Sequence, residues 1–183
     1  MNSTANGHVP IRPGVLYVGT PVIFVCTQNA DGSANLMERP ELTVNFPSPE
    51  HWSAVEAMGD VTGMEIVPAG KSARYRHHAD KFALARLSAE PSEMVAPPRV
   101  AECALQFEAT VERATRGVGD YFMVEAHVER VHAAPRIVVD GTDHVNPRTW
   151  QPLIYAFRHY FALGRELGYR PSSALAVLDP QQG

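Results

Sequence analysis

Histidine, tyrosine and arginine residues gather at two places in the chain, where their side chains could move protons or bind a polar ligand. Imidazole titrates near neutral pH, so His77 and His159 are predicted to act as acid or base. Tyr155 is predicted to donate a hydrogen bond that polarises a substrate carbonyl. These three residues are the predicted catalytic set. Their polar neighbours are predicted to bind the ligand, and they are Arg74, Arg76, His78, Arg158 and Tyr160.

Each of these predictions has a structural alternative. The arginines and histidines of the central group are also typical of a solvated polar loop, and the tyrosines of buried aromatic residues that satisfy their own hydroxyls. Adjacent histidines without a third ligand in register make a poor metal site, so no metal is predicted. Glu108 and Glu125 lie on neighbouring predicted strands and could form a carboxylate couple, but a solvated strand face is the favoured interpretation.

Short strands are predicted to position these side chains. Near the N-terminus, β-branched and aromatic residues over 15–19 and 21–27 precede the turn residues Asn29 to Gly32, which predicts a hairpin returning over 33–37. Hydrophobic and polar residues alternate over 41–46, as in a half-buried strand.

The second half of the chain contains the two longest predicted strands. Alternation predicts strands over 101–113 and 121–132, with a turn over 116–120. The polar face of this ribbon is predicted to meet water, a polar cavity or a partner. The apolar and aromatic segment 152–163 is predicted to begin as a strand and to continue as a bulge or helix.

Two short helices are predicted between these groups of strands. Ser48 as N-cap, Pro49 at the first helical position and a following glutamate predict a helix through about Met58, with Trp52 and Val55 on the same face as Met58. Asp80 is predicted to cap a second helix over 80–84.

The order of the elements predicts a mainly β protein, namely a small antiparallel barrel with short peripheral helices. Its 183 residues, of which 45% are hydrophobic, suit a single domain, predicted over 15–170 between a flexible arm at 1–14 and a tail at 171–183. Cys26 and Cys103 lie in apolar runs and are predicted to be buried free thiols.

Charge and hydropathy exclude several partners. The net charge is −4 and the 16 lysines and arginines are dispersed, so no nucleic-acid partner is predicted. No segment approaches the ~20 consecutive apolar residues of a membrane helix, so no membrane partner is predicted. The first 13 residues lack the order of a secretory signal, so the protein is predicted to be cytoplasmic.

Five stretches of sequence resemble, in order, landmarks of the flavin-reductase-like proteins with the FMN-binding split barrel. The resemblance covers roughly residues 15 to 164 and implies a split β-barrel fold. The stretches are VGTPVIFVCT at 18–27, NADGSANL at 29–36, RHHADKF at 76–82, PPRVAEC at 97–103 and NPRTWQPLI at 146–154.

One departure from this family pattern bears on the cofactor. The family has strands that line the isoalloxazine ring and then a Ser/Thr-rich turn that opens a helix gripping the FMN phosphate. Here only the ten residues from Leu36 to Asn45 separate Asn35 from Phe46, so the phosphate-binding segment is predicted to be missing. Without donors that replace its hydration, a phosphate dianion binds poorly. Arg39 could supply one charge, although a solvated arginine is the favoured interpretation.

Three functions follow as hypotheses. The favoured one is a cofactor-independent enzyme that holds an apolar, polyketide-like small molecule in the barrel cavity and promotes its cyclisation or isomerisation. The alternative is an FMN-dependent NAD(P)H flavin reductase, with the flavin held by a rebuilt loop or by a dimer partner. A non-catalytic small-molecule-binding protein is the third. The resemblance also implies a homodimer, for which the polar face of the two long strands is the predicted contact.

Overall fold

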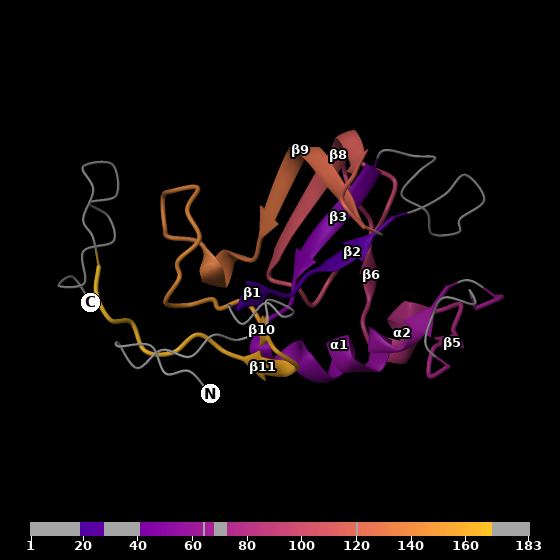
Figure 1. Ribbon diagram of the computed structural model, residues 1–183. Coiled ribbons are helices and arrows are strands. Elements are labelled where there is room, and N and C mark those ends of the chain that lie inside the picture. Colours follow the sequence, from indigo (N-terminus) through magenta and orange to yellow (C-terminus); the bar gives the residue numbers. More distant parts are fainter. Residues whose placement is uncertain (1–18, 28–40, 64, 68–72, 120, 170–183) are drawn as a thin grey trace, which may run out of the picture.

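An antiparallel four-stranded sheet is the largest unit of the structure, a computed structural model that describes residues 19–27, 41–63, 65–67, 73–119 and 121–169. Its strands lie in the order β2-β3-β8-β9 (Figure 1). The two long strands β8 and β9 form a ribbon at one side of this sheet, and β9 is its edge. The bounds are β2 Phe24–Cys26, β3 Glu41–Phe46, β8 Leu105–Arg116 and β9 Phe122–Ala133.

Smaller sheets complete the architecture. β1 (Thr20–Pro21), β10 (Ile154–Ala156) and β11 (His159–Phe161) form an antiparallel sheet. β6 (Ala89–Glu90) pairs antiparallel with β7 (Arg99–Val100), whereas β4 (Val61–Thr62) pairs parallel with β5 (Arg76–His77). The predicted mainly β split-barrel class is confirmed. Within the described residues the strands form four separate sheets, and the β4–β5 pair departs from the predicted antiparallel pattern.

Two short helices cover one side of the strands. A 3₁₀ turn at Pro49–His51 leads into α1 (Trp52–Gly59), and α2 is Lys81–Ala85. The predicted cap of the second helix is confirmed, because Asp80 Oδ1 accepts a hydrogen bond from Ala83 N at 2.9 Å. Ser48 is the N-cap residue with Pro49 following it, as predicted, although the Ser48 side chain makes no capping hydrogen bond. Neither α1 nor α2, the helices of the described residues, has the length to cross a membrane.

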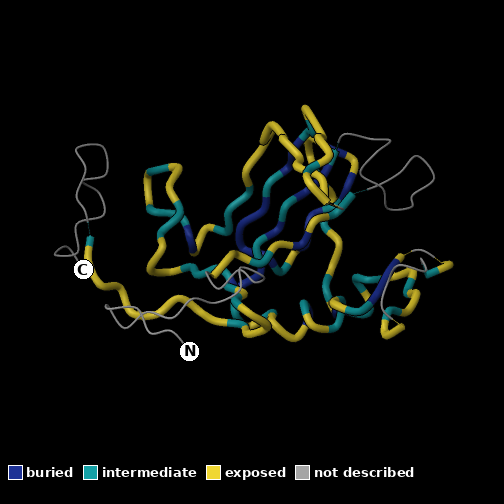
Figure 2. The backbone as a smooth tube through the Cα atoms, viewed as in Figure 1, coloured by how far each residue is buried: buried dark blue, intermediate teal, exposed yellow. Residues whose placement is uncertain are grey.

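The core consists of two apolar clusters. One lies between β2 and the two helices, where Phe24, Ala54, Ala85, Val100 and Cys103 are buried. The other surrounds Ala104, Leu105 and Ile137, with Phe46 and Phe107 packed edge-on at 5.0 Å. Figure 2 shows the buried residues concentrated along the middle strands of the sheet. Val55 and Met58 of α1 join the first cluster, but Trp52 on the predicted shared face is half exposed.

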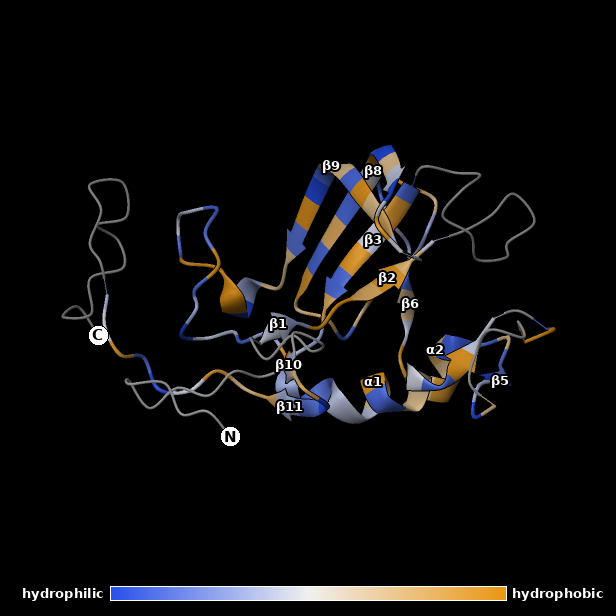
Figure 3. Ribbon diagram, in the orientation of Figure 1, coloured by the Kyte–Doolittle hydropathy of each residue, from blue (hydrophilic) through white to orange (hydrophobic). Residues whose placement is uncertain are grey.

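Alternating hydropathy along β8 and β9 is visible in Figure 3, and both strands lie close to their predicted bounds. β8 begins at Leu105 instead of 101, because residues 101 and 102 form a turn closed by Cys103 N donating to Val100 O at 3.0 Å. The apolar side chains of β9 are exposed, among them Phe122, Val124 and Val128. The predicted ribbon is therefore confirmed, but one of its apolar surfaces remains uncovered within the described part of the chain.

Two predicted hairpins have different outcomes. The return arm at 33–37 lies outside the described residues, and β2 pairs with β3. Segment 152–163 is a hairpin of β10 and β11, so the predicted bulged or helical second half is wrong. Phe157 and Arg158 turn the chain there with φ of 44° and 69°. The arm at 1–14 and the tail at 171–183 lie entirely outside the described residues, so the predicted domain bounds stay a prediction.

Candidate functional site

A cleft of about 820 Å³ opens between β2 and the helices, directly over the first apolar cluster. Its surface is mainly apolar. Phe24 and Val100 form buried walls, while Ile23 and Val25 are 44% and 48% exposed at its edge. The lining residues are Ile23, Phe24, Val25, Cys26, Thr27, Met58, Gly63, Ala79, Asp80, Lys81, Phe82, Leu87, Pro98 and Val100. A concavity of this size and polarity is typical of a small-molecule site.

One wall of the cleft is held by two polar residues of β3 that have no exposed surface. Thr43 Oγ1 donates to Pro98 O at 2.8 Å. Asn45 Oδ1 accepts from Val100 N at 2.9 Å, while Asn45 Nδ2 donates to Thr43 Oγ1 at 3.0 Å. Since Pro98 and Val100 both line the cleft, these hydrogen bonds fix its shape. The polar face of β3 therefore anchors the segment that follows β6.

The same polar face continues onto β8, where Gln106 and Glu108 are opposite Asn45 and Thr43. Gln106 Nε2 donates to Val100 O at 2.6 Å. Glu108 accepts hydrogen bonds from Glu93 N and Met94 N, at 3.0 Å and 2.6 Å. Residues 91–100, here called the covering segment, thus lie on four buried polar side chains of β3 and β8. The predicted solvated strand face is wrong at Glu108, which is 0% exposed.

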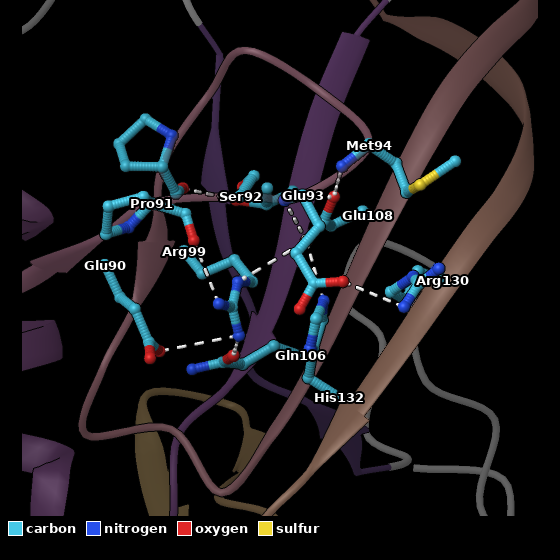
Figure 4. Close-up of polar contacts among 12 residues, drawn as sticks. Glu90, Pro91, Ser92, Glu93, Met94, Arg99, Gln106, Glu108, Arg130 and His132 are labelled. Atoms are coloured by element: carbon cyan, nitrogen blue, oxygen red, sulfur yellow. Dashed lines mark hydrogen bonds and ion pairs between the residues drawn. The ribbon is translucent and has the colours of Figure 1, made fainter.

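Two cationic or titratable groups complete this buried network, drawn in Figure 4. Arg99 Nη1 donates to Gln106 Oε1 at 2.7 Å and Nη2 donates to Pro91 O at 2.9 Å, while Nε lies 3.4 Å from Glu108 Oε1. His132 Nε2 of β9 lies 2.7 Å from the same carboxylate oxygen. Glu125 pairs with Arg113 and is remote from this group in register, so no Glu108–Glu125 couple forms.

Burial and hydrogen bonding act in opposite directions on Glu108. Desolvation by itself raises the pKa of the carboxyl, but the N–H groups of Glu93 and Met94 and the His132 ring outweigh it and hold the pKa below the ordinary 4.5. Glu108 is therefore a buried carboxylate at neutral pH. Its charge holds the covering segment in place and has no contact with the cleft.

The floor of the cleft is the first turn of α2. Lys81 brings a positive charge, Asp80 brings a negative charge, and Phe82 adds an aromatic ring. Within the described lining, Asp80 and Lys81 are the charged residues, and they are adjacent. The net charge of the described lining is therefore close to zero.

Both cysteines are free thiols as predicted; Cys26 lines the cleft, and Cys103 lies in the first apolar cluster. Burial raises the pKa of Cys26, although Thr43 and Lys81 counteract part of the effect. Burial raises the pKa of Cys103 to about 12, with Glu102 and Cys26 adding to it. Since the thiolate is the nucleophile, neither residue is set up for nucleophilic chemistry at neutral pH. Cys103 is buried as predicted, and Cys26 is partly buried.

The predicted central group lies beside the far end of the cleft. Arg74 forms an exposed ion pair with Asp60 at 2.8 Å, and Arg76 and His77 lie exposed on β5. His78 is partly buried, with an Nδ1 atom that makes no hydrogen bond, and it immediately precedes the cleft residues Ala79 and Asp80.

The second predicted group lies on the β10–β11 hairpin. Tyr160 Oη donates to Glu56 Oε1 of α1 at 2.7 Å, and burial together with Glu56 raises the pKa of Tyr160 to about 12. Tyr155 stacks at a tilt on Tyr160 at 5.2 Å, His159 is exposed beside Phe161, and Arg158 is in the turn.

These two groups are not brought together. Figure 1 shows the hairpin and β5 at opposite ends of the helical layer. None of the eight predicted site residues lines the cleft, and their predicted roles stay predictions. Within the described residues, no three His, Cys, Asp or Glu side chains come together as metal ligands. The cleft residues that sequence reasoning missed are those of β2 and α2, for which the apolar run at 23–26 was the available signal.

Comparison with known proteins bears on this cleft. The family model described as "Flavin reductase like domain" matches residues 18–164. The protein YdfE of Bacillus subtilis (strain 168) is 32% identical over 188 residues, which cover 86% of this chain and 90% of YdfE. The aligned stretch is longer than this whole chain of 183 residues, so YdfE contains residues without a counterpart here.

Solved structures share the fold. Component B of nitrilotriacetate monooxygenase from Bacillus cereus is 18% identical with a TM-score of 0.67, over 90% of this chain and 100% of that one. Flavoredoxin of Desulfovibrio vulgaris (Miyazaki F) is also 18% identical with a TM-score of 0.67, over 95% and 100%. The match of the family model over most of this chain and the 32% identity to YdfE show that the chain belongs to the flavin reductase like domain family.

Proposed function

We propose that the protein is a flavin-dependent oxidoreductase that binds FMN or a related flavin in the cleft beside β2 and uses NAD(P)H as hydride donor. The observation that supports it is an apolar cleft of about 820 Å³, in a chain of this family, with a volume suited to a tricyclic ring. When bound, the flavin accepts a hydride from NAD(P)H and a proton from water, which leaves the oxidised nicotinamide and the reduced flavin.

The described residues fit the ring of such a cofactor. Phe24, Val100 and Phe82 offer apolar contacts that exclude water from a bound ring, and the open edge at Ile23 and Val25 leaves one side accessible to a second substrate. The buried hydrogen bonds of Thr43 and Asn45 hold this wall in place before any ligand arrives, which lowers the cost of binding. The phosphate end is less well matched, since Lys81 is the cation of the described lining.

A flavin titration with a matched pair of variants tests this proposal. Val25→Asp puts a carboxylate on the half-exposed edge of the cleft and is expected to weaken flavin binding at least tenfold and to slow flavin-stimulated NADPH oxidation. Val118→Asp, at a residue that is 91% exposed in the β8–β9 turn, is the control and should leave both unchanged. Flavin fluorescence quenching gives the affinity. Equal affinities of the two variants would contradict the assignment of the cleft.

The cofactor-independent enzyme stays a second candidate, because one specific observation favours it. The described cleft is apolar and has a single lysine, which suits a neutral small molecule better than a phosphorylated cofactor. Under this candidate the acid–base and hydrogen-bonding roles of His77, Tyr155 and His159 require a ligand that extends beyond the described lining, because none of the three lines the cleft. His77→Gln or Tyr155→Phe should then slow turnover. A non-catalytic binder would bind the same small molecule without turnover. If the purified protein is colourless and does not bind added flavin, that result favours these two candidates.

We also propose that two copies of the chain associate through β9. The contact predicted from the sequence was the polar face of the ribbon, but Gln106 and Glu108 on that face are covered. The exposed alternative is the apolar side of β9, with Phe122, Val124 and Val128. β9 is an edge strand of 12 residues, so an antiparallel second copy would also cover its open edge.

A further inference from the structure

The charges of the residues that line the cleft indicate which part of a flavin the cleft recognises. Of the fourteen lining residues, the charged ones are Asp80 and Lys81, which follow each other in the chain. These two opposite charges leave the described lining with a net charge close to zero, so the lining as a whole gives little net pull on an anion.

The backbone of α2 does not provide an anion site in place of a net positive charge. Helix N-termini often bind phosphate through free N–H groups, but here the side chain of Asp80 already accepts from Ala83 N at 2.9 Å. α2 also has only five residues, so its dipole is small. The first turn of this helix is therefore closed to an anion by the protein's own carboxylate.

The family resemblance predicts a missing phosphate-binding segment between Asn35 and Phe46. Only ten residues separate Asn35 from Phe46. Segment 28–40 lies outside the described residues, and Arg39 is its one arginine or lysine. Arg39 is therefore the residue through which the alternative, a rebuilt phosphate site, can be tested.

We propose that the cleft binds flavins through the ring alone, so that riboflavin binds as tightly as FMN. This inference rests on the proposed function and names the substrate class of that cleft. The phosphate of FMN stays in water and contributes no affinity. Asp80 has a specific role here, because it both caps α2 and cancels the charge of Lys81.

Titration with three ligands tests the proposal and separates it from the proposed function. Riboflavin, FMN and lumiflavin, which has the ring without the ribityl chain, are titrated by fluorescence at low and high salt. Riboflavin and FMN are expected to bind within threefold of each other at both salt concentrations, since no charged contact is screened. FMN binding more than threefold tighter overturns this inference and leaves the proposed function standing. If none of the three binds, the proposed function fails and this inference fails with it.

Two substitutions test the charges directly. Asp80→Asn keeps a good helix cap but removes the negative charge. The affinity for FMN is then expected to exceed the affinity for riboflavin by at least threefold, and this preference should disappear at high salt. An unchanged ratio overturns the role assigned to Asp80. Arg39→Ala is expected to leave the ratio at one, and a selective loss of FMN affinity in this variant overturns the proposal by showing a phosphate site on segment 28–40.

Discussion

Glu108 is a carboxylate with no exposed surface, and it stays ionised because several donors converge on it. Two backbone N–H groups of the covering segment and the ring of His132 contact its oxygens, with the Arg99 guanidinium nearby. A buried charge with partners contributes little net stability, but removing one partner leaves the others unpaired in a medium of low polarity. Removing the Glu108 carboxylate therefore costs more stability than the intact network contributes.

Glu108→Gln is expected to lower the free energy of unfolding by about 3 kcal/mol, because it leaves Arg99 with the partly exposed Glu90 as its one remaining carboxylate and weakens two backbone hydrogen bonds. Urea unfolding followed by intrinsic fluorescence measures the change. Glu93→Gln is the matched control, since it breaks an ion pair with Arg130 in which both side chains are about half exposed, and should cost less than about 1 kcal/mol. Equal losses in the two variants would contradict the buried role.

The depressed pKa of Glu108 predicts how stability depends on pH. In the unfolded chain the group titrates near its ordinary 4.5, and in the folded protein it titrates lower. Its contribution is therefore fully present above about pH 4.5 and is lost as the pH falls through the folded pKa. The difference in unfolding free energy between the wild type and Glu108→Gln should shrink as the pH falls below 4.5. A difference that is constant down to pH 3 would show that Glu108 does not titrate as proposed.

At the scale of elements, the strands that follow a simple alternation were predictable, and those shaped by tertiary contacts were not. β8, β9 and the Asp80 cap were found from the sequence, because hydropathy and local hydrogen bonding determine them. The polar residues Thr43 and Asn45 of β3 read as a solvated face. They are buried because residues more than 50 positions later cover them, and no local pattern encodes such a contact.

The β10–β11 turn is a second case. Phe157 and Arg158 adopt positive φ without a glycine, so the usual turn signal was missing from the sequence. The backbone at position 158, with φ of 69°, accommodates glycine but not a β-branched side chain. Arg158→Val is expected to lower the free energy of unfolding by about 1–2 kcal/mol, whereas Arg158→Gly should be neutral or slightly stabilising. Thermal unfolding of the pair checks this, and a Gly variant that is less stable than the Val variant would contradict the turn geometry.

At the scale of the whole molecule, family and fold class were within reach of the sequence, but the site was not. The family follows from landmarks spread over most of the chain, so local errors do not change it. The eight predicted site residues were chosen for their chemistry alone, and the fold places them at two ends of the helical layer. The cleft is formed instead by apolar residues of β2, whose side chains give no chemical signal of their own.

The exposed apolar side of β9 is the surface on which the proposed dimer depends. Val128 is 43% exposed in the middle of this edge strand, and large apolar side chains flank it on both sides. Burying such a face against a second copy removes the apolar surface from water and also covers an unpaired strand edge.

The wild type is therefore expected to sediment as a particle of twice 20.1 kDa. Val128→Arg places a charge in that contact and should shift the protein to the monomer. Val118→Arg, in the turn beyond the strand, should leave the dimer intact. A wild type that sediments as a monomer at micromolar concentration, or a Val128→Arg variant that stays dimeric, would move the contact away from β9.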